Sequence, residues 1–243
     1  MKALTFAKRT AREILRDPLN LAFGLGFPVV LLCLLSAIQA NIPVSMFEIQ
    51  HLTPGIMVFG LSFMSLFSAT LVSKDRGSAL LHRLYTTPLT SADFILGYIL
   101  PMLPMALGQG LVCYGVGWLL GLELTVNLLW ALVLNLPIAL FYIAFGLLCG
   151  SVLSDKQVGG ICGALLTNLS AWLSGIWFDL ELVGGVFKKI AYVLPFVHGV
   201  EMERAAFVGD MQAVLSHLPW VLGYALVITV LAVVLFLRQM KRK

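Results

Sequence analysis

The sequence predicts an all-α membrane protein with six transmembrane helices, and composition, charge spacing and charge distribution each lead to this fold class. Hydrophobic residues make up 60% of the 243 residues and charged residues only 12%. A soluble domain carries about twice that charged fraction. Six windows between charged residues contain no Asp, Glu, Lys or Arg. Each window holds at least the roughly 20 apolar residues that are needed to cross a hydrocarbon core about 30 Å thick.

The basic residues predict how the six spans are oriented. An even number of spans places both termini on one side of the membrane. With the N-terminus inside, only Lys188, Lys189 and Arg204 of the 16 Lys and Arg residues lie outside, and the other 13 lie inside. Basic residues are retained on the cytoplasmic side during insertion, so we expect a multi-pass protein of the inner or plasma membrane with both termini cytoplasmic. The net charge of +4 follows from this topology and does not indicate a nucleic-acid partner.

Residues 1–18 are predicted to form an amphipathic interface helix. Its apolar residues recur at helical spacing and are Leu4, Ala7, Ala11, Ile14 and Leu15. Its basic residues take the other face and are Lys8, Arg9, Arg12 and Arg16. Asp17-Pro18 ends the helix. A helix of this kind lies along the inner membrane surface, with its basic side towards lipid headgroups or towards a cytoplasmic partner, and the pattern leaves both roles open.

The remaining elements follow from the charge-free windows. We expect the spans at about 19–40, 54–73, 93–120, 127–152, 157–178 and 214–237. The longest outer segment contains an apolar stretch, 190–200, that Pro195 interrupts and that is too short to span the bilayer. A re-entrant or interfacial helix pair at about 184–205 is the natural interpretation. No soluble domain or internal repeat is evident, so residues 1–243 are expected to form a single transmembrane domain.

The spans lack the residues that most membrane chemistry needs. Their central portions hold none of the carboxylates, His or Arg that serve ion-coupled transporters as relays. Gln109, Asn135 and Asn168 are the main polar side chains at depth, where interhelical hydrogen bonding is their commoner role. No HExxH, GxSxG or GxxxxGK[ST] motif is present, so we expect no catalytic residue, metal site or cofactor in this chain. A transporter of this composition must take its energy from another subunit.

The loop at 74–89, KDRGSALLHRLYTTPL, is the best candidate for receiving that energy. Its apolar residues fall on one helical face and are Leu80, Leu81, Leu84 and Tyr85. Polar positions surround this face and are Arg76, His82 and Arg83. Gly77 and Thr87-Pro88 mark the two ends of the short helix. Such a helix can lie across the ends of the spans and present side chains to a cytoplasmic domain, and an amphipathic loop resting on lipid fits the pattern equally well.

The same loop opens a longer motif, in which Asp75, Arg76 and Gly77 are followed by LLHRLYTTPLTSADFILG, ending at Gly97. This motif resembles the signature of ABC type-2 transporter permeases. The rest of the chain agrees in its amphipathic N-terminal helix, its Pro-Gly entry to the second span and its Leu-Pro-Phe before the last span. The family often has Glu where this chain has Asp75, and Lys where it has Tyr98.

The resemblance implies a half-transporter that carries no nucleotide itself. Two such permeases, identical or paralogous, would pair and each would bind one cytoplasmic ABC ATPase subunit, two copies in all, which would hold ATP and Mg. A coupling helix at about 75–88 would dock on the ATPase, with the N-terminal helix as a second contact. The implied ATPase-coupling residues are Asp75, Arg76, Gly77, Leu80, Leu81, Arg83, Leu84, Thr87 and Pro88.

The resemblance also implies where the substrate would pass. Spans two and five would meet at the dimer interface, where the candidate lining residues are Phe59, Phe63, Phe67, Asn168 and Trp172. The outer helices would form an external gate that includes Pro195 and Phe196. The small size and the lack of a large outer domain look most like bacterial exporters of drugs or lipids, including glycolipids. The alternatives are a non-transporting membrane scaffold or assembly protein, or a secondary transporter or channel, which would lack its usual intramembrane charges.

Overall fold

The computed structural model describes residues 2–42, 44–78 and 90–241, and all regular structure in these ranges is helical, as predicted. The elements in chain order are α1 (Lys2–Leu15), α2 (Pro18–Leu21), η1 (Ala22–Gly26), α3 (Phe27–Asn41), η2 (Ser45–Phe47), α4 (Ile49–Gly77), α6 (Ser91–Leu119), α7 (Leu128–Val152), α8 (Asp155–Val158), η3 (Gly159–Leu166), α9 (Thr167–Trp172), α10 (Leu180–Val183), α11 (Gly185–Val193), α12 (Pro195–Val208) and α13 (Met211–Lys241).

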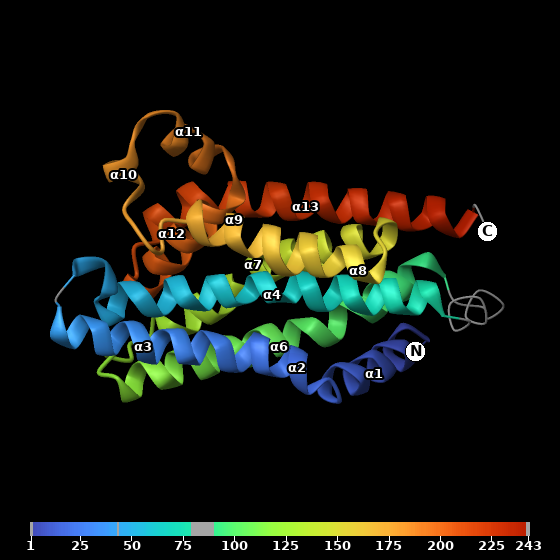
Figure 1. The fold of residues 1–243 in the computed structure, drawn as a ribbon, viewed down its shortest axis with the longest axis horizontal. Helices are drawn as coiled ribbons and strands as arrows, with labels where there is room; N and C mark the ends of the chain where they lie inside the picture. The colour runs from blue at the N-terminus through green and yellow to red at the C-terminus, as the bar shows by residue number, and fades with distance from the viewer. Residues whose placement is uncertain (1, 43, 79–89, 242–243) are drawn as a thin grey trace.

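The long helices run side by side along the long axis of the molecule (Figure 1). Both chain ends and α1 lie at one end of this bundle, which we call the terminal end. The short helices α10, α11 and α12 lie at the opposite end, which we call the α12 end. The fold therefore separates the basic N-terminal helix from the segment that was predicted to form the outer helices.

Within the described residues, five helices are long and apolar enough to cross a membrane, and they correspond to the first four and the last of the predicted spans. They are Ala22–Asn41, Ile49–Gly77, Ala92–Leu119, Leu128–Val152 and Met211–Arg238. The predicted fifth span, 157–178, is divided among α8, η3 and α9. The middle piece is π-helical, and chain from residue 173 to 179 follows without a helix. These three pieces run beside α4 (Figure 1), and the count of six spans stays a prediction.

The α4 helix is the centre of the bundle. In its most apolar 18-residue window 89% of the residues are buried, against 22 to 56% in the other four candidate spans. Small residues bring α7 close to it. A Cβ atom on Gly146 would lie 1.9 Å from Ser68 Oγ and 2.2 Å from the Ser65 carbonyl oxygen. The Ser68 hydroxyl donates to the Ile143 carbonyl across the same contact at 2.8 Å. Close packing of small residues is what holds helices together where water cannot drive association.

Polar side chains join the helices at depth. Gln109 of α6 donates to the Met57 carbonyl of α4, and Asn135 of α7 donates to the Ala106 carbonyl of α6, each at 3.1 Å. The predicted interhelical role of these two residues is confirmed. Asn168 instead donates to the Ala164 carbonyl of its own helical run, at 2.8 Å.

Replacing Gly146 with Ala is expected to lower the free energy of unfolding by about 1–3 kcal/mol, because the Ser65 carbonyl belongs to the backbone and cannot move aside. Gly108 is a matched control, since a Cβ there would meet nothing within 4 Å. Gly108→Ala is expected to be neutral or slightly stabilising, because Ala is the better helix former. Thermal unfolding of the solubilised protein measures both. Equal unfolding temperatures for the two variants would contradict the close α4–α7 contact.

Candidate functional site

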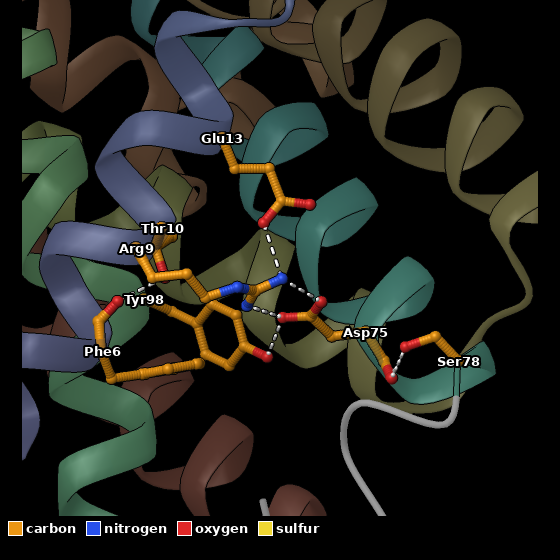
Figure 2. A network of polar contacts seen from close by, with 7 residues as sticks. All are labelled: Phe6, Arg9, Thr10, Glu13, Asp75, Ser78 and Tyr98. Carbon is orange, nitrogen blue, oxygen red and sulfur yellow. Dashed lines mark hydrogen bonds and ion pairs between the residues drawn. The ribbon is translucent and has the colours of Figure 1, made fainter. Parts of the chain in front are cut away.

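The last turn of α4 ends in a buried carboxylate that three helices share. Asp75 is only 3% exposed. Arg9 of α1 donates to both of its oxygens, from Nη1 to Oδ2 at 2.8 Å and from Nη2 to Oδ1 at 2.9 Å. The hydroxyl of Tyr98, from α6, donates to Oδ2 at 2.8 Å (Figure 2). A bidentate guanidinium–carboxylate pair is among the strongest and most directional polar contacts in proteins, so this pair fixes α1 against α4.

Arg9 has a second carboxylate on its own helix. Its Nη2 lies 2.8 Å from Glu13 Oε2, one turn further along α1. The hydrogen bonds to Asp75 raise the pKa of Arg9 above its ordinary value, so the guanidinium remains charged in this site. It also lies over the ring of Phe6, 5.7 Å from the centroid, which adds a cation–π contact.

An aromatic contact seats α1 on α6 beside the ion pair. The Phe6 ring meets Tyr98 edge-on, with centroids 5.1 Å apart, and Phe94 at 5.6 Å. A Cβ atom on Gly97 would lie 2.0 Å from Phe6 Cδ1, so only glycine leaves room for the ring. This gives a physical reason for the glycine that ends the Ile-Leu-Gly motif.

The end of α4 is attached to two further helices. The Arg76 guanidinium donates to the carbonyls of Ser151 and Leu153, where α7 ends. The Ser73 hydroxyl donates to Asp155 Oδ1 at 3.1 Å, where α8 begins. The last two turns of α4 therefore contact α1, α6, α7 and α8 through polar side chains. We call this set of contacts the α4 hub.

The α4 hub lies directly before the segment that was predicted to couple to an ATPase. Asp75, Arg76 and Gly77 belong to α4 itself. The other predicted coupling residues lie outside the described residues and are Leu80, Leu81, Arg83, Leu84, Thr87 and Pro88. The capping box of Thr90 and Asp93 starts α6 on the far side of this segment.

The structure divides the apolar face of α1 into two parts. Phe6, Ala7 and Ile14 are buried against the bundle, whereas Leu4 and Leu15 are each 69% exposed. The basic side of α1 borders an open groove of about 610 Å³, whose lining residues are Arg9, Arg12, Glu13, Arg16, Asp17 and Pro18. Of the four predicted basic residues, Arg9 is the one that the α4 hub uses.

The candidate lining residues fall into two groups within one chain. The rings of Phe59 and Phe63 pack against the ring of Phe27, with centroid distances of 6.3 and 5.7 Å. Phe67 is fully buried. Trp172 is 61% exposed, and Asn168 is also exposed. The exposed members thus come from the run α8–η3–α9, and the buried members from α4.

At the α12 end, a pair of histidines joins α12 to α13. His198 Nε2 lies 2.9 Å from the carbonyl of Tyr192, which can only accept, so Nε2 carries a hydrogen. In the neutral ring Nδ1 is then an acceptor, and it receives the Nδ1 hydrogen of His217 at 2.9 Å. The indole of Trp220 stacks on the His198 ring, with centroids 4.7 Å apart. Burial lowers the pKa of His198 below its ordinary value, so it stays neutral at pH 7.

Two more polar residues fix α12 to the rest of the bundle. Glu203 is fully buried and accepts a hydrogen bond from Tyr114 of α6 at 2.8 Å. Burial raises the pKa of Glu203 well above the ordinary range, which favours the neutral carboxyl group. Arg204 donates to the carbonyls of Gly175 and His51, each at 3.3 Å, the latter in the first turn of α4. Of the predicted gate residues, Phe196 packs its ring against Phe141 and Tyr142, and Pro195 starts α12.

Sequence reasoning did not find these α12 residues. Periodicity cannot tell which polar side chains of a short terminal helix face inward. The signal that was available is the density of polar groups in VHGVEMERAAF, which is high for a segment that is otherwise apolar.

Comparison with known proteins identifies the family. Residues 2–208 match the ABC-2 type transporter family. The chain belongs to this family. Two relatives are capsule polysaccharide export inner-membrane proteins CtrC of Neisseria meningitidis. The serogroup B protein is 28% identical over 109 residues, and the serogroup A protein is 26% identical over 105 residues. These matches cover 45 and 43% of this chain and 40 and 38% of the relatives, so the chain spans well under half of their length.

In this ABC-2 permease, the two departures from the family pattern contact each other. Asp75 stands where Glu is frequent, Tyr98 stands where Lys is frequent, and the Tyr98 hydroxyl bonds the Asp75 carboxylate. The positive charge beside Asp75 comes from Arg9 of α1.

Acid is expected to loosen the α12 end. A histidine whose folded-state pKa is lowered contributes stability above about pH 6.5, and this contribution is lost as the pH falls through the lower folded value. Glu201 favours the protonated His198 ring, while His217, which donates to its Nδ1, opposes protonation.

Hydrogen exchange of the α12 amides between pH 7.5 and 5 measures the effect. We expect faster exchange at pH 5 in the wild type and a weaker pH dependence in His198→Gln. The exposed His51→Gln is the control. If it weakened the pH dependence of exchange as much as His198→Gln does, the effect could not be assigned to His198.

Proposed function

We propose that this chain is the permease of an ATP-driven exporter in the inner membrane, which moves an amphipathic or hydrophobic substrate outward with energy from a separate ATPase. Membership of the ABC-2 family supports a membrane component that relies on another subunit for ATP hydrolysis. The observation that carries the proposal is the α4 hub. Four helices attach to the end of α4 directly before the segment 79–89, so a push on that segment reaches all of them.

The path of the force would be α4 itself. One end of α4 holds Asp75, and the other holds His51, whose carbonyl binds Arg204 of the proposed gate helix α12. A helix that is buried along its length cannot rotate without moving its neighbours. ATP binding would close the ATPase pair, and α4 would carry that movement from the α4 hub to α12.

The run α8–η3–α9 would complete the six spans. It is helical without a break over residues 155–172. Both termini lie at one end of the bundle, as an even number of crossings requires (Figure 1). The basic residues of α1 favour the cytoplasm for that end. Asn168 and Trp172 are exposed on this run and would face a second permease copy or paralogue and the exit path.

The substrate class that we propose is a lipid, a glycolipid or a drug-like amphiphile. The names of the two relatives add capsule polysaccharide to these candidates. Membrane lipid would contact the exposed apolar residues of the spans, and the ATPase would be present in two copies.

The proposal is tested by co-purifying the chain with candidate ATPases and measuring ATP turnover in lipid. Arg83 is the residue to reverse, because Arg76 holds the end of α7. Arg83→Glu is expected to weaken ATPase binding at least about tenfold, as a reversed interface charge costs 1.4 kcal/mol or more. Lys189→Glu, at the α12 end, is the control and should bind as the wild type does. If no ATPase binds or is stimulated, the chain is a scaffold instead.

A further inference from the structure

The ion pair between α1 and α4 is built so that each member has a second partner. Arg9 contacts Asp75 on α4 and Glu13 on its own helix. Asp75 contacts Arg9 on α1 and the Tyr98 hydroxyl on α6 (Figure 2). The second partners, Glu13 for Arg9 and Tyr98 for Asp75, belong to different helices, α1 and α6, so one can be kept without the other.

This arrangement changes what it costs to separate α1 from α4. Breaking a buried ion pair normally leaves an uncompensated buried charge, and that is strongly unfavourable. Here Arg9 would keep Glu13, because both residues move together on α1. Asp75 would keep the Tyr98 hydroxyl, because neither residue belongs to α1. Neither charge would lose its last partner.

The two members differ in how much they need that second partner. The Arg9 side chain is 35% exposed and can be solvated when it is released, whereas the Asp75 side chain is 4% exposed and cannot. The Tyr98 hydroxyl is therefore the more important of the two alternatives. A carboxylate that loses one partner but keeps a hydroxyl donor retains part of its stabilisation.

The contact beside the ion pair provides a pivot. The Phe6 ring sits in the space that Gly97 leaves open, against Phe94 and Tyr98. This contact is apolar and largely non-directional, so it tolerates a rotation of α1 that a bidentate ion pair does not. Arg9 lies one turn beyond Phe6, and its bidentate pair with Asp75 requires a fixed orientation, so a rotation of α1 about Phe6 would strain this pair.

We propose that Arg9 and Asp75 form a releasable latch between α1 and α4, with Tyr98 as the positioning residue that holds Asp75 while the latch is open. The inference rests on the proposed function, because the ATPase would contact both α1 and the segment 79–89, and the ion pair joins α1 to the helix α4 that precedes this segment. The latch is closed in the resting permease and opens when ATP drives the ATPase against the two contacts. Tyr98 acts on the rate of opening and touches neither substrate nor nucleotide.

Spin labels on either side of the latch test the opening directly. Leu15→Cys and Lys74→Cys place labels at exposed positions of α1 and α4, after Cys33, Cys113, Cys149 and Cys162 have been replaced. The permease–ATPase complex is measured in lipid without nucleotide and with ATP trapped. We expect one short distance without nucleotide and an added longer distance with ATP. An unchanged distance in a complex that hydrolyses ATP would overturn the latch and leave the proposed function standing.

Tyr98→Phe separates the positioning role from a structural one. It keeps the ring that packs on Phe6 and removes only the hydroxyl. We expect ATP turnover to fall about tenfold, which corresponds to 1.4 kcal/mol in the barrier, with the KM for ATP and the unfolding temperature close to wild type. Adding Asp75→Asn removes both the buried charge and the ion pair with Arg9, so the double variant should show the longer distance with and without ATP.

The matched control is Tyr224→Phe, which removes a hydroxyl that donates to the Val193 carbonyl at the α12 end. It should keep the ATP-dependent distance change between the labels. A Tyr98→Phe variant that unfolds earlier but still opens and turns over at the wild-type rate would show that Tyr98 is only structural, and the latch would fail. If no ATPase binds the wild-type chain, the proposed function fails and the latch fails with it.

Discussion

A single buried carboxylate organises the terminal end of this permease. Asp75 is almost fully enclosed, and a charge in that position must be met by donors from its surroundings. Those donors come from two other helices, Arg9 of α1 and Tyr98 of α6. The amphipathic helix α1 is therefore held by a specific polar contact in addition to its apolar face. The same turn of α4 leads into the segment between α4 and α6, where we propose that the ATPase binds.

Composition and charge spacing were enough to predict an all-helical fold that includes helices long and apolar enough to cross a membrane. They did not predict that the fifth expected span is divided into three helical pieces, because a charge-free window does not reveal whether its helix is regular. Glycines at 159, 160 and 163 lie in the π-helical piece. The predicted apolar face of α1 was also incomplete, because it left out the buried Phe6. Phe6 interrupts the predicted pattern, and its role depends on the space at Gly97, which lies about 90 residues away in the sequence.

The site was predictable in position but not in contacts. The motif around Asp75 located the α4 hub, and its two departures from the family pattern, Asp75 and Tyr98, were visible in the sequence as separate differences. Only the fold shows that they are bonded to each other. The burial of Glu203 could not be predicted, because the sequence of a short helix does not show which of its two carboxyl groups faces the bundle. Glu203 accepts a hydrogen bond from Tyr114 and so adds a polar contact between α12 and α6.

The contacts of α4 differ in kind along its length, and this difference separates a rigid part of the molecule from a movable one. Towards α7 the helix is packed through Gly146, Ser65 and Ser68 at distances that leave no room for a methyl group. Helices in such close contact move together or not at all. Towards α1 the helix is held by an ion pair whose members both have alternatives. Force applied at the end of α4 therefore meets a stiff connection on the α7 side and a separable one on the α1 side. The mechanism that we propose moves α12 while the spans stay packed, and this requires both kinds of connection. The buried helix α4, which carries Asp75 at one end and His51 at the other, combines them.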